Sequence, residues 1–451
     1  MNLAKMGLGA MNAAQYRLKT AAHNVNNSAV EGYNRQTVLT QSAGAQATGA
    51  GYIGRGVQAV TVDRSYDNFL FTQLVQAEGH GASLRSFANE INQLDTLVAD
   101  RTVGVSPALE KFFASVNAVA SEPNDPAARE EMLGQANNLA TQLRETNAYM
   151  VRQRDNLNNQ ITTTVDQVNS YIERIHDANQ QIVKARASAT KHEPNDLLDQ
   201  RDQLVKELNQ LVGVKVFEQD GRINLAVGNG QVVLSGNAVY PLTAMRSEED
   251  PERIVVGITV KDSTGTMVGV EMDENYIRGG QLGGLIQYRQ EVLDDVQNNL
   301  GRMAVGLSAA FNELHKEGVD LLGNAGAEFF SVGAPKVIPS NGTQSAISVE
   351  LADVNALTAD DYRVTPMLDA DGALTGFEVV NLTTGAGPFN IANGGVHEGV
   401  KFSLSAGSSA PVGGDSWRVQ PTRDAAARIN VEVTDPAKIA AAAPEIGRAH
   451  V

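Results

Sequence analysis

The chain has 451 residues, a formal net charge of −16, 42% hydrophobic residues and no cysteine, so about three domains with ordinary cores are expected. The acidic balance gives nucleic acid and anionic membranes little electrostatic attraction, and we expect neither as a partner. Disulfides, thiolate metal sites and thiol nucleophiles are excluded, and the sequence predicts neither a ~20-residue apolar membrane span nor a secretory signal peptide.

The first expected element is a helix of small residues. Apolar and small side chains recur at steps of four and three, which places them in one stripe: Leu3, Gly7, Met11, Ala14, Leu18, Ala21 and Val25. Such a stripe buries little surface, so the helix needs a close-packed partner helix to offset its ordering entropy. We therefore expect residues 1 to about 30 to fray in the isolated monomer and to become helical on assembly.

The helix ends in the stretch AAHNVNNSAVEGYNRQ. Asn24 and Asn27 can compete for backbone hydrogen bonds, and Gly32 permits a left-handed turn. We expect Tyr33 to bury its ring and bond its hydroxyl, and Arg35 to anchor the corner from which the strand RQTVLTQ leaves. By local chemistry alone, this stretch is a helix stop of a kind that ordinary domains also contain.

Long helical patterns dominate the middle of the chain. Asp125 and Pro126 form a helix start signal, and no further proline occurs before residue 187. Along this helix a seven-residue apolar repeat, broken once at Asn179, runs through Leu157, Ile161, Val165, Val168, Ile172, Ile175 and Ile182. At 1.5 Å per residue, about 60 residues give a helix of ~90 Å, so we expect an elongated helical bundle. Further helices are predicted over 66–98, 195–212 and 284–316.

Strands are expected to interrupt the bundle twice. Asp-Gly and Asn-Gly turns between alternating runs predict a hairpin meander within 214–275. Residues 333–420 are rich in Gly, Ser, Thr and Val and predict an inserted β domain. The predicted fold class is therefore α+β and multidomain. The expected order is an N-terminal helix and extended connector at 1–65, a long-helix bundle at 66–332, the inserted β domain at 333–420, and a return to the helical domain at 421–444.

Motifs for catalysis or cofactor binding lack their required context. GAGYIG at 49–54 fits a dinucleotide fingerprint, but a strand-like run follows it where a helix is needed. The seven histidines are never three or four residues apart, so they form no helical pair of metal ligands. Asp369 and Asp371 before Gly372 predict a hairpin turn, because the later acidic ligands of a calcium loop do not align. We predict no catalytic residue, no cofactor and no metal, although sequence alone leaves open whether any two of the 52 carboxylates form a catalytic pair.

Several stretches resemble the bacterial flagellar axial proteins, the family of rod, hook and hook-associated subunits. The N-terminal MGLGAMNAAQYRLKTAAHNVNNSAVEGYNRQ is similar to the signature of this family, a small-residue helix followed by an asparagine-rich stop and Gly-Tyr. The Arg-Gln after Tyr33, and later EPNDPAAREEML, NDLLDQRDQLVKELNQLVGVKV and GDSWRVQPTRDAAARINVEVTDPAKIAAA, are most similar to the hook-associated subunits. The similarity runs from residue 1 to about 442 and is weak between 333 and 413.

The resemblance implies a structural subunit without enzymatic activity, which polymerises as a ring at the junction of hook and filament and transmits torque. The implied partners are further copies of the chain, the hook protein, the next hook-associated junction protein and the flagellar export apparatus. The implied location is extracellular, on the flagellum, after type III export without a cleaved signal peptide. The residues expected in assembly and axial packing are Leu3, Met11, Ala14, Leu18, Ala21, Asn24, Val25, Asn27, Gly32, Tyr33, Arg35 and Gln36.

The residues leave two alternatives open. One is another axial subunit of the hook or rod type, against which the length of the 126–187 helix weighs. The other is an enzyme or a carbohydrate-binding protein, whose site would lie in 333–420 as a pocket with carboxylates and aromatic platforms. The ending IGRAHV is expected to belong to a non-native tail at 445–451, so the C-terminal axial helix of the family and its chaperone contacts would be missing.

Overall fold

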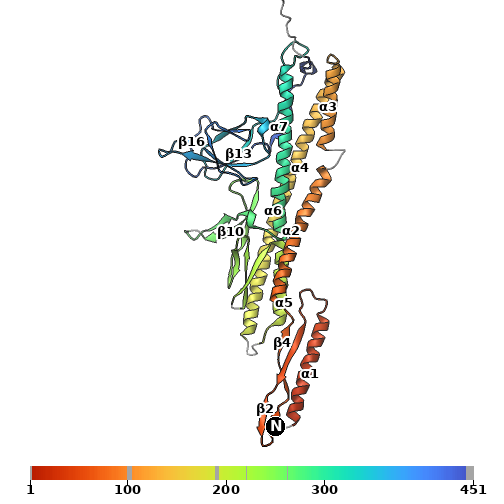
Figure 1. Ribbon diagram of the computed structural model, residues 1–451, viewed down its shortest axis with the longest axis vertical. Coiled ribbons are helices and arrows are strands. Elements are labelled where there is room, and N and C mark those ends of the chain that lie inside the picture. The colour runs from red at the N-terminus through yellow and green to blue at the C-terminus, as the bar shows by residue number, and fades with distance from the viewer. Residues whose placement is uncertain (1–2, 99–103, 188–191, 220, 262, 443–451) are drawn as a thin grey trace, which may run out of the picture. The chain divides into compact units, whose positions relative to one another are not determined.

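The computed structural model describes residues 3–98, 104–187, 192–219, 221–261 and 263–442 (Figure 1). The chain divides into two compact units. Unit 1 comprises 1–87, 161–245 and 255–286, and unit 2 comprises 88–160, 246–254 and 287–451. The predicted domain limits at 65, 332 and 420 stay a prediction. The predicted non-native tail lies outside the described residues.

The helices confirm the predicted long helical patterns, with one correction. The 61-residue α4 begins at Pro126 as predicted. The pattern at 284–316 begins earlier, at Gly280, and is interrupted by the π-helical turn η2, because the Asp294 N–H bonds the Arg289 carbonyl five residues back. The helices are α1 (Leu3–Asn26), α2 (Asn68–Val98), α3 (Val105–Ser121), α4 (Pro126–Arg186), α5 (Asn195–Leu211), α6 (Gly280–Tyr288), η2 (Arg289–Leu293), α7 (Asp294–Glu317) and α8 (Ala425–Arg428).

The apolar repeat on α4 is buried at every position that the sequence predicted, from Leu157 to Ile182. The break at Asn179 has a structural cause. Its side-chain amide donates to the Ile223 carbonyl at 2.8 Å, and its oxygen accepts from the Ile223 N–H at 3.2 Å. A buried asparagine therefore pairs with a strand backbone as a neighbouring strand would, at the cost of one apolar position.

The strands of unit 1 form small antiparallel sheets. A long ribbon leaves the corner after α1: β1 (Gln36–Ser42) pairs with β4 (Val57–Arg64), and β2 (Ala45–Thr48) pairs with β3 (Gly51–Gly54) at its tip. The expected meander is present as the four-stranded order β5-β6-β7-β8 and the three-stranded order β11-β10-β9. Their bounds are β5 (Val214–Gln219), β6 (Arg222–Val227), β7 (Gln231–Ser235), β8 (Ala238–Val239), β9 (Leu242–Arg246), β10 (Ile254–Lys261) and β11 (Met267–Glu271).

Unit 2 joins helices and strands in one hydrophobic core. Phe112 of α3, Phe311 of α7 and the neighbouring Phe329 and Phe330 pack together, and the same core extends to Trp417 in the sheets. The sheets are ordered β13-β20-β15-β16-β17, β14-β19-β18 and β12-β21. Their bounds are β12 (Phe330–Ser331), β13 (Lys336–Pro339), β14 (Ile347–Leu351), β15 (Tyr362–Leu368), β16 (Leu374–Asn381), β17 (Phe389–Ala392), β18 (Val396–His397), β19 (Val400–Leu404), β20 (Trp417–Gln420) and β21 (Asn430–Val431).

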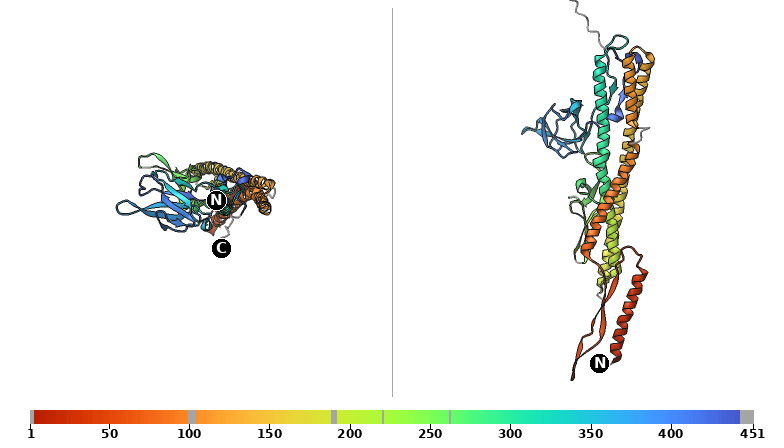
Figure 2. Two further views of the ribbon diagram at one scale, coloured as in Figure 1. Left: turned by 90° about the horizontal axis from the view of Figure 1, so that it is seen from above. Right: turned by 45° about the vertical axis from the view of Figure 1, so that its right-hand side comes forward.

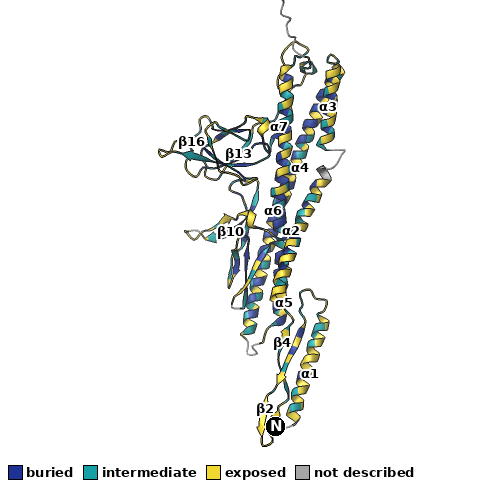
Figure 3. Cartoon of the chain, viewed as in Figure 1, coloured by how far each residue is buried: buried dark blue, intermediate teal, exposed yellow. Residues whose placement is uncertain are grey.

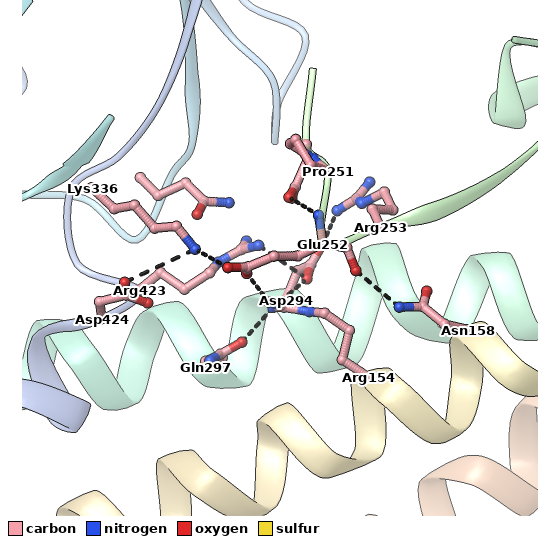
Figure 4. Close-up of polar contacts among 12 residues, drawn as sticks. Arg154, Asn158, Pro251, Glu252, Arg253, Asp294, Gln297, Lys336, Arg423 and Asp424 are labelled. Carbon is pink, nitrogen blue, oxygen red and sulfur yellow. Dashed lines mark hydrogen bonds and ion pairs between the residues drawn. The ribbon is translucent and has the colours of Figure 1, made fainter. Parts of the chain in front are cut away.

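A buried charge cluster around Asp294 ties distant segments of unit 2 together (Figure 4). Arg154 of α4 lies 3.3 Å from the Asp294 carboxylate, Arg423 lies 3.3 Å from it, and Arg253 also donates to it. Burial alone would raise the pKa of Asp294, but the three guanidinium groups outweigh burial and hold that pKa far below its usual range. Asp294 therefore stays ionised and joins α4, α7, the 246–254 segment and the chain after β20.

Candidate assembly site at the N-terminal corner

One face of α1 packs on the β1–β4 ribbon within unit 1. Figures 1 and 2 show the helix alongside the ribbon. Ala13 is buried there at 4% exposure, and a Cβ added at Gly9 would lie 2.9 Å from the Val57 carbonyl oxygen. Arg17 donates to the Thr40 hydroxyl at 2.7 Å. Within the described residues, α1 packs on a β ribbon, because Gly9 and Ala13 admit a strand backbone at close range. The partner helix expected for the stripe stays a prediction.

The predicted stripe lies on the exposed face of α1. Met11, Leu18 and Val25 are 63%, 72% and 72% exposed, and Ala14 and Ala21 are exposed between them. Figure 3 shows α1 coloured mainly as exposed. Leu3 begins the helix, and its side chain lies outside the described set. The packed face runs through Gly9 and Ala13, about 130° around the helix from the stripe. The subunit's own described fold therefore leaves the stripe uncovered.

Asn24 fixes the exit of the ribbon from the helix. Its amide donates to the Gln36 carbonyl at 2.9 Å, and its oxygen accepts from the Gln36 N–H at 2.9 Å. The Tyr33 hydroxyl also donates to the Asn24 oxygen, at 2.7 Å, as predicted for a hydroxyl that needs a polar partner. Asn24 therefore bonds both the N–H and the carbonyl of Gln36, the first residue of β1, which would otherwise be unpaired.

Gly32 occupies the turn that the sequence predicted. Its φ is +80°, and an added Cβ would lie 2.8 Å from the Cβ of Gln203 on α5. Asn27 sits one turn earlier and donates to the His23 carbonyl at 3.0 Å, which closes the end of α1. The His23 ring meets the half-buried Tyr33 ring edge-on at 5.6 Å between centroids. A left-handed backbone and a close neighbour together make this corner specific for glycine.

A row of carboxylates on α5 receives the corner, and sequence reasoning missed it. Asp196, Asp199 and Asp202 follow at i, i+3 and i+6, so they share one helix face. The Gln36 amide donates to Asp196 at 2.7 Å. Asn34 donates to Asp199 from its backbone N–H at 2.9 Å and from its side chain at 2.8 Å. The spacing in NDLLDQRD was a usable signal, since three aspartates on one helix face need donors.

The arginine that anchors the corner is Arg64, not Arg35. Arg64 donates to Asp199 at 2.9 Å and to Asp202 at 2.7 Å, and its guanidinium lies 3.9 Å from the centre of the Tyr66 ring. The Arg35 side chain is exposed and forms no hydrogen bond or ion pair with the described part of the chain. Arg64 takes the role because β4 pairs with β1 in a register that puts Arg64 opposite Gln36, directly over α5.

The two tyrosine hydroxyls of the corner have raised pKa values. Burial, together with the charges of Asp196 and Asp199, raises the pKa of the Tyr33 hydroxyl. Burial and the charge of Asp202 raise the pKa of Tyr66 to about 12. Both hydroxyls therefore stay protonated at neutral pH and can donate hydrogen bonds.

Within the described segments, no helix is long and apolar enough to cross a membrane.

Comparison with known proteins gives consistent matches. The family model "Flagellar hook-associated protein FlgK helical domain" matches residues 91–330. Flagellar hook-associated protein 1 of Escherichia coli K12 is 34% identical over 98% of this chain and 80% of its own length, and that of Salmonella typhimurium LT2 is 35% identical over 98% and 79%. The solved flagellar hook junction protein FlgK from Burkholderia pseudomallei superimposes with a TM-score of 0.72 at 32% identity, covering 82% of this chain and 66% of that one.

Proposed function

Because this chain belongs to the flagellar hook-associated protein 1 family, we propose that it is a structural subunit that polymerises at the junction of hook and filament, connects the two and transmits torque. Its partners are further copies of itself in a ring, the hook protein, the next hook-associated junction protein and the flagellar export apparatus. Its location is extracellular, on the flagellum, after export without a cleaved signal peptide. It acts by binding, without catalysis, and neither nucleic acid nor membrane is among its partners.

The exposed stripe of α1 is the observation that carries this proposal. Met11, Leu18 and Val25 form a row of large apolar side chains in water, on a helix whose other face is already packed. Contiguous exposed apolar rows mark interaction surfaces in soluble proteins. Residues 1–30 also contain Lys5, Arg17 and Lys19 and no carboxylate, within a chain of net charge −16. The stripe therefore suits an apolar surface with an acidic rim on a neighbouring subunit.

The residues of the corner have a second role in assembly, which is to orient α1. Asn24, Tyr33 and Gln36 set the angle at which the ribbon leaves α1, and the carboxylates of α5 fix that corner to the rest of unit 1. The corner thus orients the stripe. We propose that the assembly residues on α1 make contacts with neighbouring subunits, and that those at the turn are positioning residues.

Replacement of the stripe tests the proposal in cells. A strain without its own hook-associated protein 1 is given this chain, and incorporation at the hook tip is measured by immunogold labelling together with filament attachment. Leu18→Ser with Val25→Ser should abolish both, while thermal unfolding stays unchanged, since both side chains are exposed. Val412→Ser is the matched control, because Val412 is 58% exposed and lies far along the chain in unit 2. Normal incorporation of the stripe variant, or equal loss in the control, would contradict the proposal.

A further inference from the structure

The outer edge of β4 accepts donors from outside the ribbon. Ser65 N–H bonds the Arg35 carbonyl at 2.8 Å, so residues 35 and 65 form a hydrogen-bonded pair. In an antiparallel ribbon, hydrogen-bonded and non-hydrogen-bonded residue pairs alternate. Gln36–Arg64 and Val38–Val62 are therefore non-hydrogen-bonded pairs, and their backbone N–H and C=O groups point away from the other strand. The side-chain amide of Asn195 bonds the outward Val62 carbonyl at 2.9 Å. Among the residues that the structure describes, no strand pairs with β4 beyond this point on its outer side.

A groove of about 960 Å³ lies along this part of the ribbon. Its lining includes Ala59 to Val62 of β4, Gln36 and Val38 of β1, and Tyr16, Lys19 and Thr20 of α1. Glu193 and Asp196, at the start of α5, also line it. Proteins add an extended segment to an exposed sheet edge by backbone hydrogen bonds.

The tip of the ribbon has the opposite character. All eight residues of β2 and β3 are exposed, including Tyr52 at 82% and Ile53 at 55%. A two-stranded hairpin without a covering layer is marginal in water, because it buries too little apolar surface. Arg55 is the only charged residue from Gln36 to Val62, whereas the groove lining holds two carboxylates, Glu193 and Asp196, against the single ammonium of Lys19.

We infer that the β2–β3 tip of one copy of the chain docks in the groove between α1 and β4 of a second copy. An edge strand of the tip adds to β4 along Ala59–Thr61, next to the Val62 carbonyl that Asn195 already occupies. The Tyr52 and Ile53 side chains fill the groove, and Arg55 faces the carboxylates of Glu193 and Asp196. More than half of each carboxylate side chain is exposed, so each can accept a further donor beside its present partners, which include Arg186 at 2.8 Å for Glu193 and Gln36 at 2.7 Å for Asp196. This inference deepens the proposed self-assembly and names the contact that propagates it.

The contact has a direction. The tip and the groove are different surfaces at different places on one ribbon, so a copy that offers its tip still has its groove free. Such heterologous contacts continue from copy to copy and produce rings or helical arrays, whereas a surface that pairs with itself stops at a dimer. The inference therefore predicts a polar order of subunits.

Disulfide trapping between purified copies tests the inference without a flagellum. The chain has no cysteine, so Ile53→Cys and Val60→Cys introduce the only thiols. The two single variants, mixed and oxidised, should give a linked heterodimer in about tenfold greater yield than Ile53→Cys mixed with Leu39→Cys. Leu39 is the matched control, since it is an exposed apolar residue of the same ribbon, paired opposite Thr61, that does not line the groove.

The double variant adds a second readout. Positions 53 and 60 are seven residues apart along extended chain, about 20 Å, which is too far for a disulfide within one copy. The double variant should therefore form a ladder of linked oligomers beyond the dimer. Equal yields in the test and control mixtures, or faster linkage of the Ile53→Cys variant to a second copy of itself, would overturn the inference. If the cysteine variants are linked but the chain does not incorporate at the hook tip, only the proposed function is contradicted. If the chain incorporates but the cysteine variants are not linked, only the inference is contradicted.

Discussion

Arg423 and Asp361 lie 2.8 Å apart in the buried centre of unit 2, between Nη2 and Oδ2, although 62 residues separate them in the chain. Arg423 also reaches Asp294 of α7, and Arg418 of β20 donates to the same Asp361 oxygen at 3.0 Å. The two carboxylates thus hold the strands of the β region and the long helices in one arrangement. Buried charges of this kind stabilise the fold only while each has its partner, because removal of one partner leaves the other charge buried and unpaired, which lowers the free energy of unfolding.

Removing one carboxylate should therefore destabilise unit 2 strongly. Asp361→Ala leaves the buried Arg418 guanidinium without its carboxylate and removes one of the two carboxylates that Arg423 binds, so the free energy of unfolding should fall by about 3–5 kcal/mol. Glu350→Ala is the control, since Glu350 forms an exposed ion pair with Lys401 at 3.1 Å; it should cost less than about 1 kcal/mol. Urea unfolding followed by circular dichroism measures both, and equal losses would show that the cluster adds no special stability.

Acid should unfold unit 2 through the same carboxylates. For Asp294 and Asp361, burial opposes ionisation, but the arginines around them outweigh burial and lower both pKa values. Their folded pKa lies below the unfolded value of about 3.9, so the stability they contribute is complete above pH ~4 and is lost as the pH falls below it. The free energy of unfolding should drop less steeply below pH ~4 in Asp294→Asn than in the parent chain. An unchanged slope would contradict this assignment.

Protonation of His315 should break its hydrogen bond with the Ala440 N–H, at a higher pH than the aspartates require. Its Nδ1–H donates to the Ala327 carbonyl at 2.7 Å, and its Nε2 accepts from the Ala440 N–H at 2.9 Å, which requires the neutral ring. Burial lowers the pKa of His315, so the stability it adds is complete above the unfolded pKa of ~6.5 and is lost as the pH falls through the lower folded value. The protection factor of the Ala440 amide should fall between pH ~7.5 and ~5 while that of Val364 in β15 stays constant. Equal behaviour of the two amides would refute the link to His315.

At the corner, Gly32→Val in the full-length protein should abolish incorporation at the hook tip and leave the melting of the long helices nearly unchanged. The turn orients α1 and adds little to the core, while valine at φ +80° meets Gln203. Gly44→Val is the control for the backbone, because Gly44 has φ +82° with open space around it; both variants carry a left-handed strain of about 1–2 kcal/mol. Thermal melting and filament attachment separate the effects. Normal swimming with valine at position 32 would reduce this stretch to a simple helix stop.

The amides of α1 should exchange quickly in the dilute monomer. Among the described side chains of α1, Ala13 alone is buried, so the helix has little packing to hold it. Hydrogen exchange should show weak protection from residue 4 to 26 and strong protection from 157 to 182 in α4. Slow exchange along both helices would mean that α1 is stable before assembly.

Local and periodic features could be predicted from the sequence. The seven-residue repeat from Leu157 to Ile182 is buried throughout, because side chains at that spacing share one face of any helix. The Asn-Gly turn at 229–230 and the glycine at 32 were predictable for a similar reason, since each turn conformation depends on its own few residues. These features describe the elements and the stop after α1, and they carry the family resemblance.

Only the tertiary structure decided which partners those elements take. From the sequence, Arg35 was predicted to anchor the corner after α1. The register of β1 and β4 instead puts Arg64 over Asp199 and Asp202, which lie more than 130 residues further along the chain. The sequence did not predict that the β1–β4 ribbon packs on α1, and it gave Asn179 no partner, where the structure has the backbone of β6. Periodicity defines a face within one element, but the choice of partner depends on contacts between residues far apart in the chain, and no local pattern encodes these.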